Sequence, residues 1–99
     1  MKVRFSPRAR RRVKIVATWW RENRPAAATL FDDELRAVVE RLTSLTVLDS
    51  EYKTVGEEVI RRTLLPKSGQ HVYYSVDEED GVIIIHTVWG ARRGRAPKL

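Results

Sequence analysis

Residues 71–89, HVYYSVDEEDGVIIIHTVW, decide the fold because they contain two strand-like segments joined by an acidic turn. HVYYSV (71–76) and VIIIHTVW (82–89) are rich in β-branched and aromatic residues, which are enriched in strands. Gly81 can take the positive φ that a tight hairpin turn requires. Because VIII (82–85) is apolar at four successive positions, it predicts an interior strand covered on both faces.

Two further strands are predicted outside this hairpin. VIRRTLL (59–65) is joined to residue 71 by the turn-like PKSGQ (66–70), so it is expected to pair with the hairpin. At the N-terminus, KVRFS (2–6) alternates polar and apolar residues, which predicts a short strand with Val3 and Phe5 inward.

Two helices are predicted between these strands. Ser6-Pro7 is typical of a helix start, and Asn23-Arg24-Pro25 ends a first helix of about Pro7 to Asn23. A second helix is predicted from Pro25, where apolar residues recur at intervals of three and four: Ala28, Phe31, Leu35, Val38, Leu42 and Leu45. The short connection makes the two helices an antiparallel hairpin.

The sequence therefore predicts one α+β domain over residues 1–99, with element order βααβββ. The helical hairpin is expected to pack on one face of a mainly antiparallel sheet. A chain of 99 residues holds one hydrophobic core.

Composition excludes several classes of protein. The absence of cysteine excludes disulfides, and two histidines, His71 and His86, argue against a catalytic metal site. No apolar run is long enough to span a membrane, and the N-terminus is charged where a signal peptide is apolar. We expect a cytoplasmic protein without cofactor, metal or membrane contact.

Charge is concentrated at the two ends. Residues 1–14 hold seven cations and no acid, and residues 89–99 hold four cations and no acid. The middle, 15–88, holds eight cations against thirteen anions. This asymmetry predicts a polyanion or an acidic protein surface as partner, the alternative being that the basic ends are simply solvated.

The first helix carries a candidate binding face. RARRR (8–12) places cations where they oppose the helix dipole, which indicates a role beyond local stability; the equally open alternative is that arginine is a good helix former. Trp19 shares a face with Arg8, Arg12 and Ile15. We favour its burial against the second helix, with partial exposure to a partner as the alternative. Trp20 is predicted to be core.

The strands carry a second candidate site. Arg61 and Arg62 must point to opposite faces of the sheet, whereas His71 and Tyr73 share one face. An arginine, a histidine and a tyrosine on an open face could bind phosphate and transfer protons in RNA cleavage. We favour the alternative, an ordinary solvent-exposed face.

Taken in order, SPRA, RP-A-A, IRRTLLP, HVYYSVD and VIIIHTVWGARRGRAP resemble the RelE/ParE superfamily of bacterial type II toxins over nearly the whole chain. The resemblance implies a helical hairpin on an antiparallel sheet. It also implies one of two activities. RelE-like members are ribosome-dependent endoribonucleases that cut mRNA, and ParE-like members poison DNA gyrase.

The two branches imply different sites. Nuclease members use basic residues on the sheet and a tyrosine or histidine near a C-terminal helix. Here GARRGRAPKL (90–99) lacks both residue types, its glycines and proline predict no helix, and Lys53 is the only lysine between the second helix and VIRRTLL. With a helical hairpin of close to 40 residues, the chain looks more like the ParE branch. If it were a nuclease, the resemblance would assign Arg61, Arg62, His71, Tyr73 and Arg92.

We therefore expect a toxin that inhibits DNA gyrase, is neutralised by a cognate antitoxin, serves in plasmid stabilisation and has no catalysis of its own. The alternatives are a RelE-like nuclease acting on ribosome and mRNA, and an inactive toxin-like subunit that only binds antitoxin or a DNA site. The expected target-binding residues are Arg61, Arg92, Arg93 and Arg95, and the expected antitoxin-binding residues are Arg8, Arg12, Ile15 and Trp19. Gly90 is expected to let the chain turn, so that Arg92 and Arg93 emerge from an anchored strand end.

Overall fold

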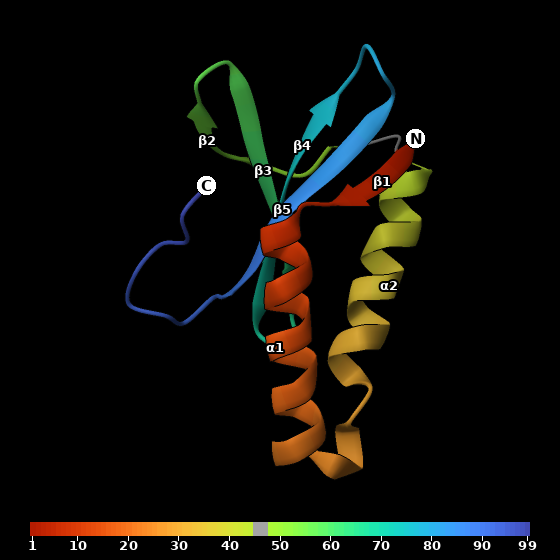
Figure 1. The fold of residues 1–99 in the computed structure, drawn as a ribbon, viewed down its shortest axis with the longest axis vertical. Coiled ribbons are helices and arrows are strands. Elements are labelled where there is room, and N and C mark those ends of the chain that lie inside the picture. The colour runs from red at the N-terminus through yellow and green to blue at the C-terminus, as the bar shows by residue number, and fades with distance from the viewer. Residues whose placement is uncertain (45–47) are drawn as a thin grey trace.

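A computed structural model describes residues 1–44 and 48–99 (Figure 1). The elements along the chain are β1 (Lys2–Phe5), α1 (Pro7–Asn23), the 3-10 turn η1 (Pro25–Ala27), α2 (Leu30–Thr43), β2 (Glu51–Val55), β3 (Glu58–Leu65), β4 (Gln70–Asp77) and β5 (Val82–Gly90). The fold is α+β, with an N-terminal strand and a helical hairpin beside a mainly antiparallel sheet, as the sequence predicted. None of the described helices is both long and apolar enough to cross a membrane.

The five strands lie in the order β1-β5-β4-β3-β2. β1 runs parallel to β5, and the other neighbours are antiparallel. β5 is interior, as predicted, and its Val82, Ile83 and Ile85 are buried. Burial on both faces was predicted for VIII, but Ile84 is only partly buried because the helices cover one face of the sheet.

The strand β2 was missed, so the observed order is βααββββ and the predicted βααβββ is wrong by one strand. β2 is an edge strand that pairs only with β3. Its Glu51, Lys53 and Thr54 are exposed, which leaves only Tyr52 and Val55 partly buried. A strand with so little buried surface has no apolar run by which it could be recognised in the sequence.

Local chemistry fixes the start and end of α1 where the sequence predicted them. The Ser6 hydroxyl accepts a hydrogen bond from the Ala9 N–H at 3.0 Å and donates one to the His86 carbonyl at 3.0 Å. Pro7 takes the first helical position, where no N–H is needed. At the other end the Arg24 N–H donates to the Trp20 carbonyl, and Pro25 follows.

The second helix begins at Leu30, five residues later than predicted. Residues Pro25–Ala27 form the 3-10 turn instead, which gives the tight reversal that the chain needs between two antiparallel helices. Proline was read as the first residue of α2, but it begins this turn. The apolar seam is nevertheless correct, since Phe31, Leu35, Val38 and Leu42 are all buried. Leu45 lies outside the described residues.

The core lies between the hairpin and one face of the sheet. Its buried members come from both helices and from β3, β4 and β5: Ala9, Val16, Ala17, Phe31, Leu35, Val38, Leu42, Leu65, Val72, Tyr74, Ile83, Ile85 and Val88. The C-terminal end of α1, the N-terminal end of α2 and the connection between them extend beyond the sheet (Figure 1). Side chains at that end of the hairpin therefore lack a sheet to cover them.

Candidate functional site

A β-bulge shapes the sheet face that lies away from the helices. Tyr73 lies opposite Thr87 and Tyr74 opposite Ile85, so β5 carries one extra residue, His86. Because of this extra residue, Ile85 and Val88 both point into the core although they are three positions apart in the strand. His86 lies with its Nε2 2.7 Å from the Ser75 Oγ.

The open face carries a pocket of about 250 Å³, which we call the open-face pocket. It is lined by Tyr52, Arg62, His71, Tyr73, Trp89 and residues of the C-terminal segment. The Tyr52 and Tyr73 rings meet edge to face at 5.0 Å, and the Arg62 guanidinium lies 4.6 Å from the Tyr52 ring. His71 and Tyr73 share this face, as predicted, and of the two neighbouring arginines it is Arg62 that joins them.

The pocket could bind an anion, but its proton chemistry is limited. Burial, and secondarily the Arg62 charge, lowers the pKa of His71, so this imidazole is neutral at neutral pH. Tyr73 is only 3% exposed and packs between Tyr52 and His71. A substrate in the pocket can therefore reach Arg62 and His71 more easily than Tyr73.

Arg61 lies on the opposite face and serves the fold. It pairs in register with the core residue Tyr74, and its guanidinium donates to the Asp49 carbonyl at 2.8 Å. A second nitrogen lies 3.6 Å from Glu51, and the side chain is 20% exposed. The Tyr74 hydroxyl donates to the Asp49 carboxylate at 2.6 Å, and burial together with this bond raises the pKa of Tyr74 to about 12. The structure does not bring Arg61 to the open-face pocket.

Trp89, at the end of β5, is surrounded by arginines. The guanidinium carbons of Arg93, Arg12 and Arg95 lie 4.1, 5.0 and 5.8 Å from its ring centroid. Its indole N–H donates to the Arg95 carbonyl at 2.9 Å. Cation–π contacts of this kind are worth about 0.5–1 kcal/mol each at exposed sites. Neither Trp89 nor Tyr52 was singled out from the sequence, although an aromatic residue three positions before the Arg92-Arg93 pair was a usable signal for Trp89.

The segment after β5, residues 91–99, which we call the tail, is not helical and is fastened to α1 and β5. Arg8 donates to the Lys98 carbonyl at 2.8 Å, and Pro97 is buried. Gly90 is not among the described glycines with positive φ, so its predicted role in the turn needs correction. A Cβ at Gly90 would lie 3.1 Å from the Arg93 Cγ, so a larger residue there would require the Arg93 side chain to shift.

The arrangement leaves positive charge uncompensated around Trp89. Burial lowers the pKa of Arg12, and the neighbouring charge of Arg93 lowers it further. Among the ion pairs of the described residues, none involves Arg8, Arg12, Arg93 or Arg95. Arg92 is exposed beside them. The tail thus forms an anchored cationic surface that could bind an anionic group of a partner.

A second hollow lies along α1 and has a volume of about 470 Å³; we call it the α1 groove. It is lined by Arg12, Ile15, Val16, Trp19, Trp20, Arg24, Ser68, Gln70 and Arg93. Burial of Trp19 was the favoured prediction and is wrong, since Trp19 is 47% exposed. It lies near the end of α1, where its ring is 5.5 Å from the Trp20 ring in an edge-to-face arrangement and 5.9 Å from the Arg24 guanidinium. Ile15 is 56% exposed beside it, and Trp20 is partly buried against the core.

Metal binding finds no support in the part of the chain that the structure describes. Within residues 1–44 and 48–99, no three histidine, cysteine, aspartate or glutamate side chains gather as metal ligands would.

The two histidines are expected to make stability depend on pH. Burial lowers the pKa of both His71 and His86, so near pH 6 the unfolded chain binds more protons than the folded one. Their contribution is fully present above their ordinary value of about 6.5 and is lost as the pH falls through the folded pKa values. The double substitution His71→Asn/His86→Asn should flatten the loss of unfolding free energy between pH 7.5 and 5. Urea unfolding at several pH values measures this, and an unchanged slope in the double variant would contradict it.

Comparison with known proteins places the chain in a family. The family model described as ParE toxin of type II toxin-antitoxin system, parDE, matches residues 3–94. The fold is similar to the crystal structure of the isolated E. coli RelE toxin, with a TM-score of 0.57 and 22% sequence identity over 94% of this chain and 86% of that chain. No curated protein matches the sequence. With nearly its whole length matched, the chain belongs to the ParE toxin family of type II toxin–antitoxin systems, within the RelE/ParE superfamily.

Proposed function

We propose that this toxin acts by inhibiting DNA gyrase and that its tail contacts the target. The observation that carries the proposal is the anchored cluster of Arg93 and Arg95 on Trp89, with Arg92 exposed beside it. Arginine suits such a surface because its planar fork pairs with carboxylate or phosphate in two parallel hydrogen bonds. The tail supplies cations for binding and no side chain that could act as a general acid or base near pH 7.

Only part of the residue set proposed for a nuclease is accessible in the open-face pocket. Of the five that it would use, Arg61 is engaged on the helix side, Tyr73 is 3% exposed, and Arg92 has no described contact with the pocket. Arg62 and His71 still line the open-face pocket beside Trp89, which could hold a phosphate. This pair is the specific observation that keeps ribosome-dependent mRNA cleavage as the second candidate.

Two reconstituted assays separate the candidates. Purified toxin should block supercoiling of relaxed plasmid by gyrase and should produce no codon-positioned cleavage on ribosomes programmed with message. Cleavage that disappears in Arg62→Ala or His71→Ala would reverse the assignment. If the folded protein has neither effect, the remaining reading is a toxin-like subunit that only binds its antitoxin.

A type II toxin has an antitoxin partner, and we propose that it docks in the α1 groove. The groove combines two exposed apolar side chains, Ile15 and Trp19, with three arginines that could pair with acidic residues. The groove also contains Ser68 and Gln70, whose side chains are partly buried.

Removal of the aromatic anchor should weaken this complex. Trp19→Ala is expected to cost about 2 kcal/mol or more of binding free energy, close to a thirtyfold rise in Kd, because buried tryptophans dominate interfaces. Titration calorimetry with the purified antitoxin measures the change. Leu64→Ala is the matched control, since Leu64 is also 47% exposed but lies outside the groove. Equal affinity of wild type and Trp19→Ala would rule out this docking site.

A further inference from the structure

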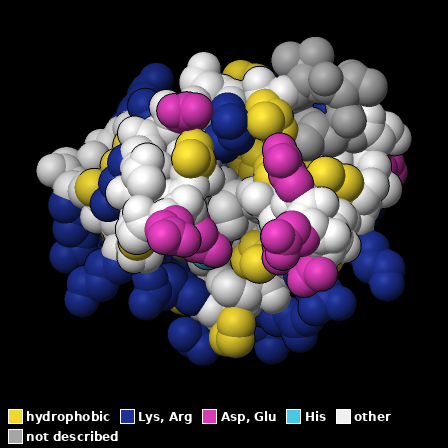
Figure 2. All heavy atoms as spheres, turned by 90° about the horizontal axis from the view of Figure 1, so that it is seen from above, with side chains coloured by type: hydrophobic (Ala, Val, Ile, Leu, Met, Phe, Trp, Pro, Cys, Tyr) yellow, Lys and Arg dark blue, Asp and Glu magenta, His cyan; other side chains and the backbone are white. Residues whose placement is uncertain are grey.

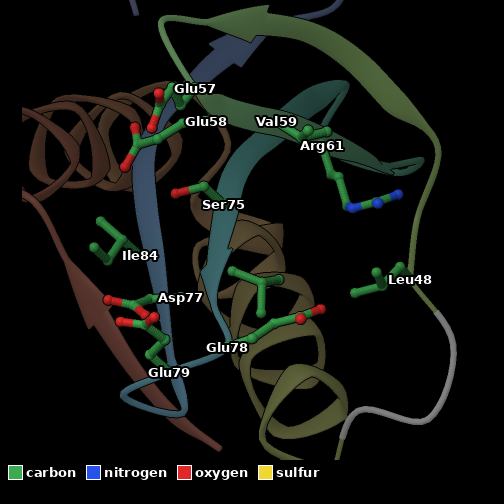
Figure 3. A pocket seen from close by; sticks show the side chains of 11 residues that line it. Leu48, Glu57, Glu58, Val59, Arg61, Ser75, Asp77, Glu78, Glu79 and Ile84 are labelled. Carbon is green, nitrogen blue, oxygen red and sulfur yellow. The ribbon is translucent and has the colours of Figure 1, made fainter.

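The strands β3 and β4 stop pairing at one end of the sheet. Their pairing ends at Arg61 and Tyr74, and two residues further along the same register Val59 would face Val76. Both residues instead line a cleft of about 550 Å³. Figure 3 shows Val59 on β3 and Ser75 on β4 among the side chains of this cleft. Beyond this point β3 pairs only with β2, and β4 pairs only with β5, so the sheet opens into two arms (Figure 1).

Two register shifts lie at the opening, one in the β4–β5 pairing and one in the β2–β3 pairing between Glu51 and Lys53, next to Arg61. The extra residue, His86, lies where the β4–β5 register shifts between Tyr73 and Tyr74. This is also the place where β4 leaves β3. A bulge increases the local right-handed twist of a strand pair, and the two arms diverge where both pairings shift register.

The parting exposes backbone groups on both walls of the cleft. The Arg62 N–H donates to the Ser50 carbonyl at 3.3 Å, so the even-numbered residues of β3 direct their backbone groups away from β4. Since successive residues of a strand alternate in direction, Val59 directs its N–H and C=O into the cleft. The same alternation, continued from the Arg61–Tyr74 pair, directs the backbone groups of Val76 into the cleft from β4. Two free strand edges therefore face one space, and free edges are templates for a further strand.

The cleft has a definite chemical character. Apolar side chains of Leu48, Val59, Val76 and Ile84 line it, and Leu48 is 37% exposed. Its rim is acidic, with Glu57, Glu58, Asp77, Glu78 and Glu79 among the lining residues. Figure 2 shows carboxylates around exposed hydrophobic side chains on this face, with lysines and arginines mostly toward the periphery. The one cation in the described lining is Arg61, which is already engaged by Asp49 and Glu51.

We propose that this cleft binds an extended segment of a partner protein that carries lysine or arginine at alternate positions. The segment pairs its backbone with the free edge at Val59 or Val76, which is strand addition to a sheet. Its cationic side chains meet the acidic rim, and the side chains between them lie on the apolar floor. The occupant is a different protein, because the basic segments of this chain are already committed. RARRR is helical, and the tail is fastened by Trp89 and Arg8.

The probes are synthetic nine-residue peptides that alternate arginine and valine, added to the intact toxin. One comparison peptide carries glutamate in place of arginine, and another is N-methylated at alternate backbone nitrogens. The first peptide should bind at least about tenfold more tightly than either. Amide hydrogen exchange should slow at Val59 or Val76 on binding.

Substitutions in the toxin test the acidic rim. Glu57→Lys/Glu58→Lys should weaken peptide binding at least about tenfold. The control is Glu22→Lys/Glu40→Lys, which makes the same change in net charge at exposed helix positions and should leave peptide binding unchanged.

Three results would overturn the proposal. Binding that is equally reduced by both double substitutions would mean that only net charge matters. Binding that survives N-methylation, with no slowing of exchange at Val59 or Val76, would exclude strand addition. Self-association of the toxin that is lost in Glu57→Lys/Glu58→Lys would assign the cleft to a second copy of this chain.

Discussion

Replacing Leu42 by alanine is expected to lower the free energy of unfolding by about 2–5 kcal/mol. Leu42 is fully buried at 0% exposure in the core between the hairpin and the sheet. Truncation removes apolar contacts and leaves a cavity that the packed helices can fill only in part. Urea unfolding followed by circular dichroism measures the change.

Leu64→Ala serves as the control for this experiment. The Leu64 side chain is 47% exposed on β3, so the same chemical truncation should cost far less. If Leu42→Ala unfolds at the same urea concentration as wild type, the helical hairpin does not pack as described.

The second large effect is expected in the tail. Arg92→Ala/Arg93→Ala should abolish growth inhibition when the toxin is expressed without antitoxin, because it removes two of the cations presented at the end of β5. Folding should be little affected. Arg92 is exposed, and loss of the Arg93 contact with Trp89 should cost only about 0.5–1 kcal/mol.

Arg10→Ala/Arg11→Ala is the matched control, since both arginines are exposed on α1 and the change in net charge is the same. This variant should remain toxic. A folded Arg92→Ala/Arg93→Ala variant that inhibits growth as strongly as wild type would show that the tail arginines are not needed at the target.

The fold could be predicted where local chemistry and core packing agree. Ser6-Pro7 and Arg24-Pro25 bound α1 because capping and proline geometry act within a few residues. The seam of α2 is correct because buried residues on one helix face must recur at intervals of three and four. The start of α2 was not predictable in the same way, because Pro25 suits a 3-10 turn as well as a helix.

The candidate site was only partly predictable, because it depends on register and on how far elements extend. Strand alternation alone separated Arg61 from Arg62 and joined His71 to Tyr73. Trp19 is exposed together with Ile15 on the face of α1 that lines the α1 groove, and helical spacing alone does not show which face the second helix covers. The cleft between β3 and β4 lies where the β4–β5 and β2–β3 pairings both shift register, and sequence alternation could not place these shifts.

Supercoiling by purified gyrase, titrated with the toxin, shows whether the toxin inhibits gyrase and whether its tail is needed. Wild type and Arg10→Ala/Arg11→Ala should block supercoiling at similar concentrations. Arg92→Ala/Arg93→Ala should need at least about tenfold more protein, and added antitoxin should restore supercoiling. Unimpaired supercoiling at a large excess of folded wild-type toxin, together with cleavage of message on ribosomes by the same preparation, would contradict gyrase inhibition.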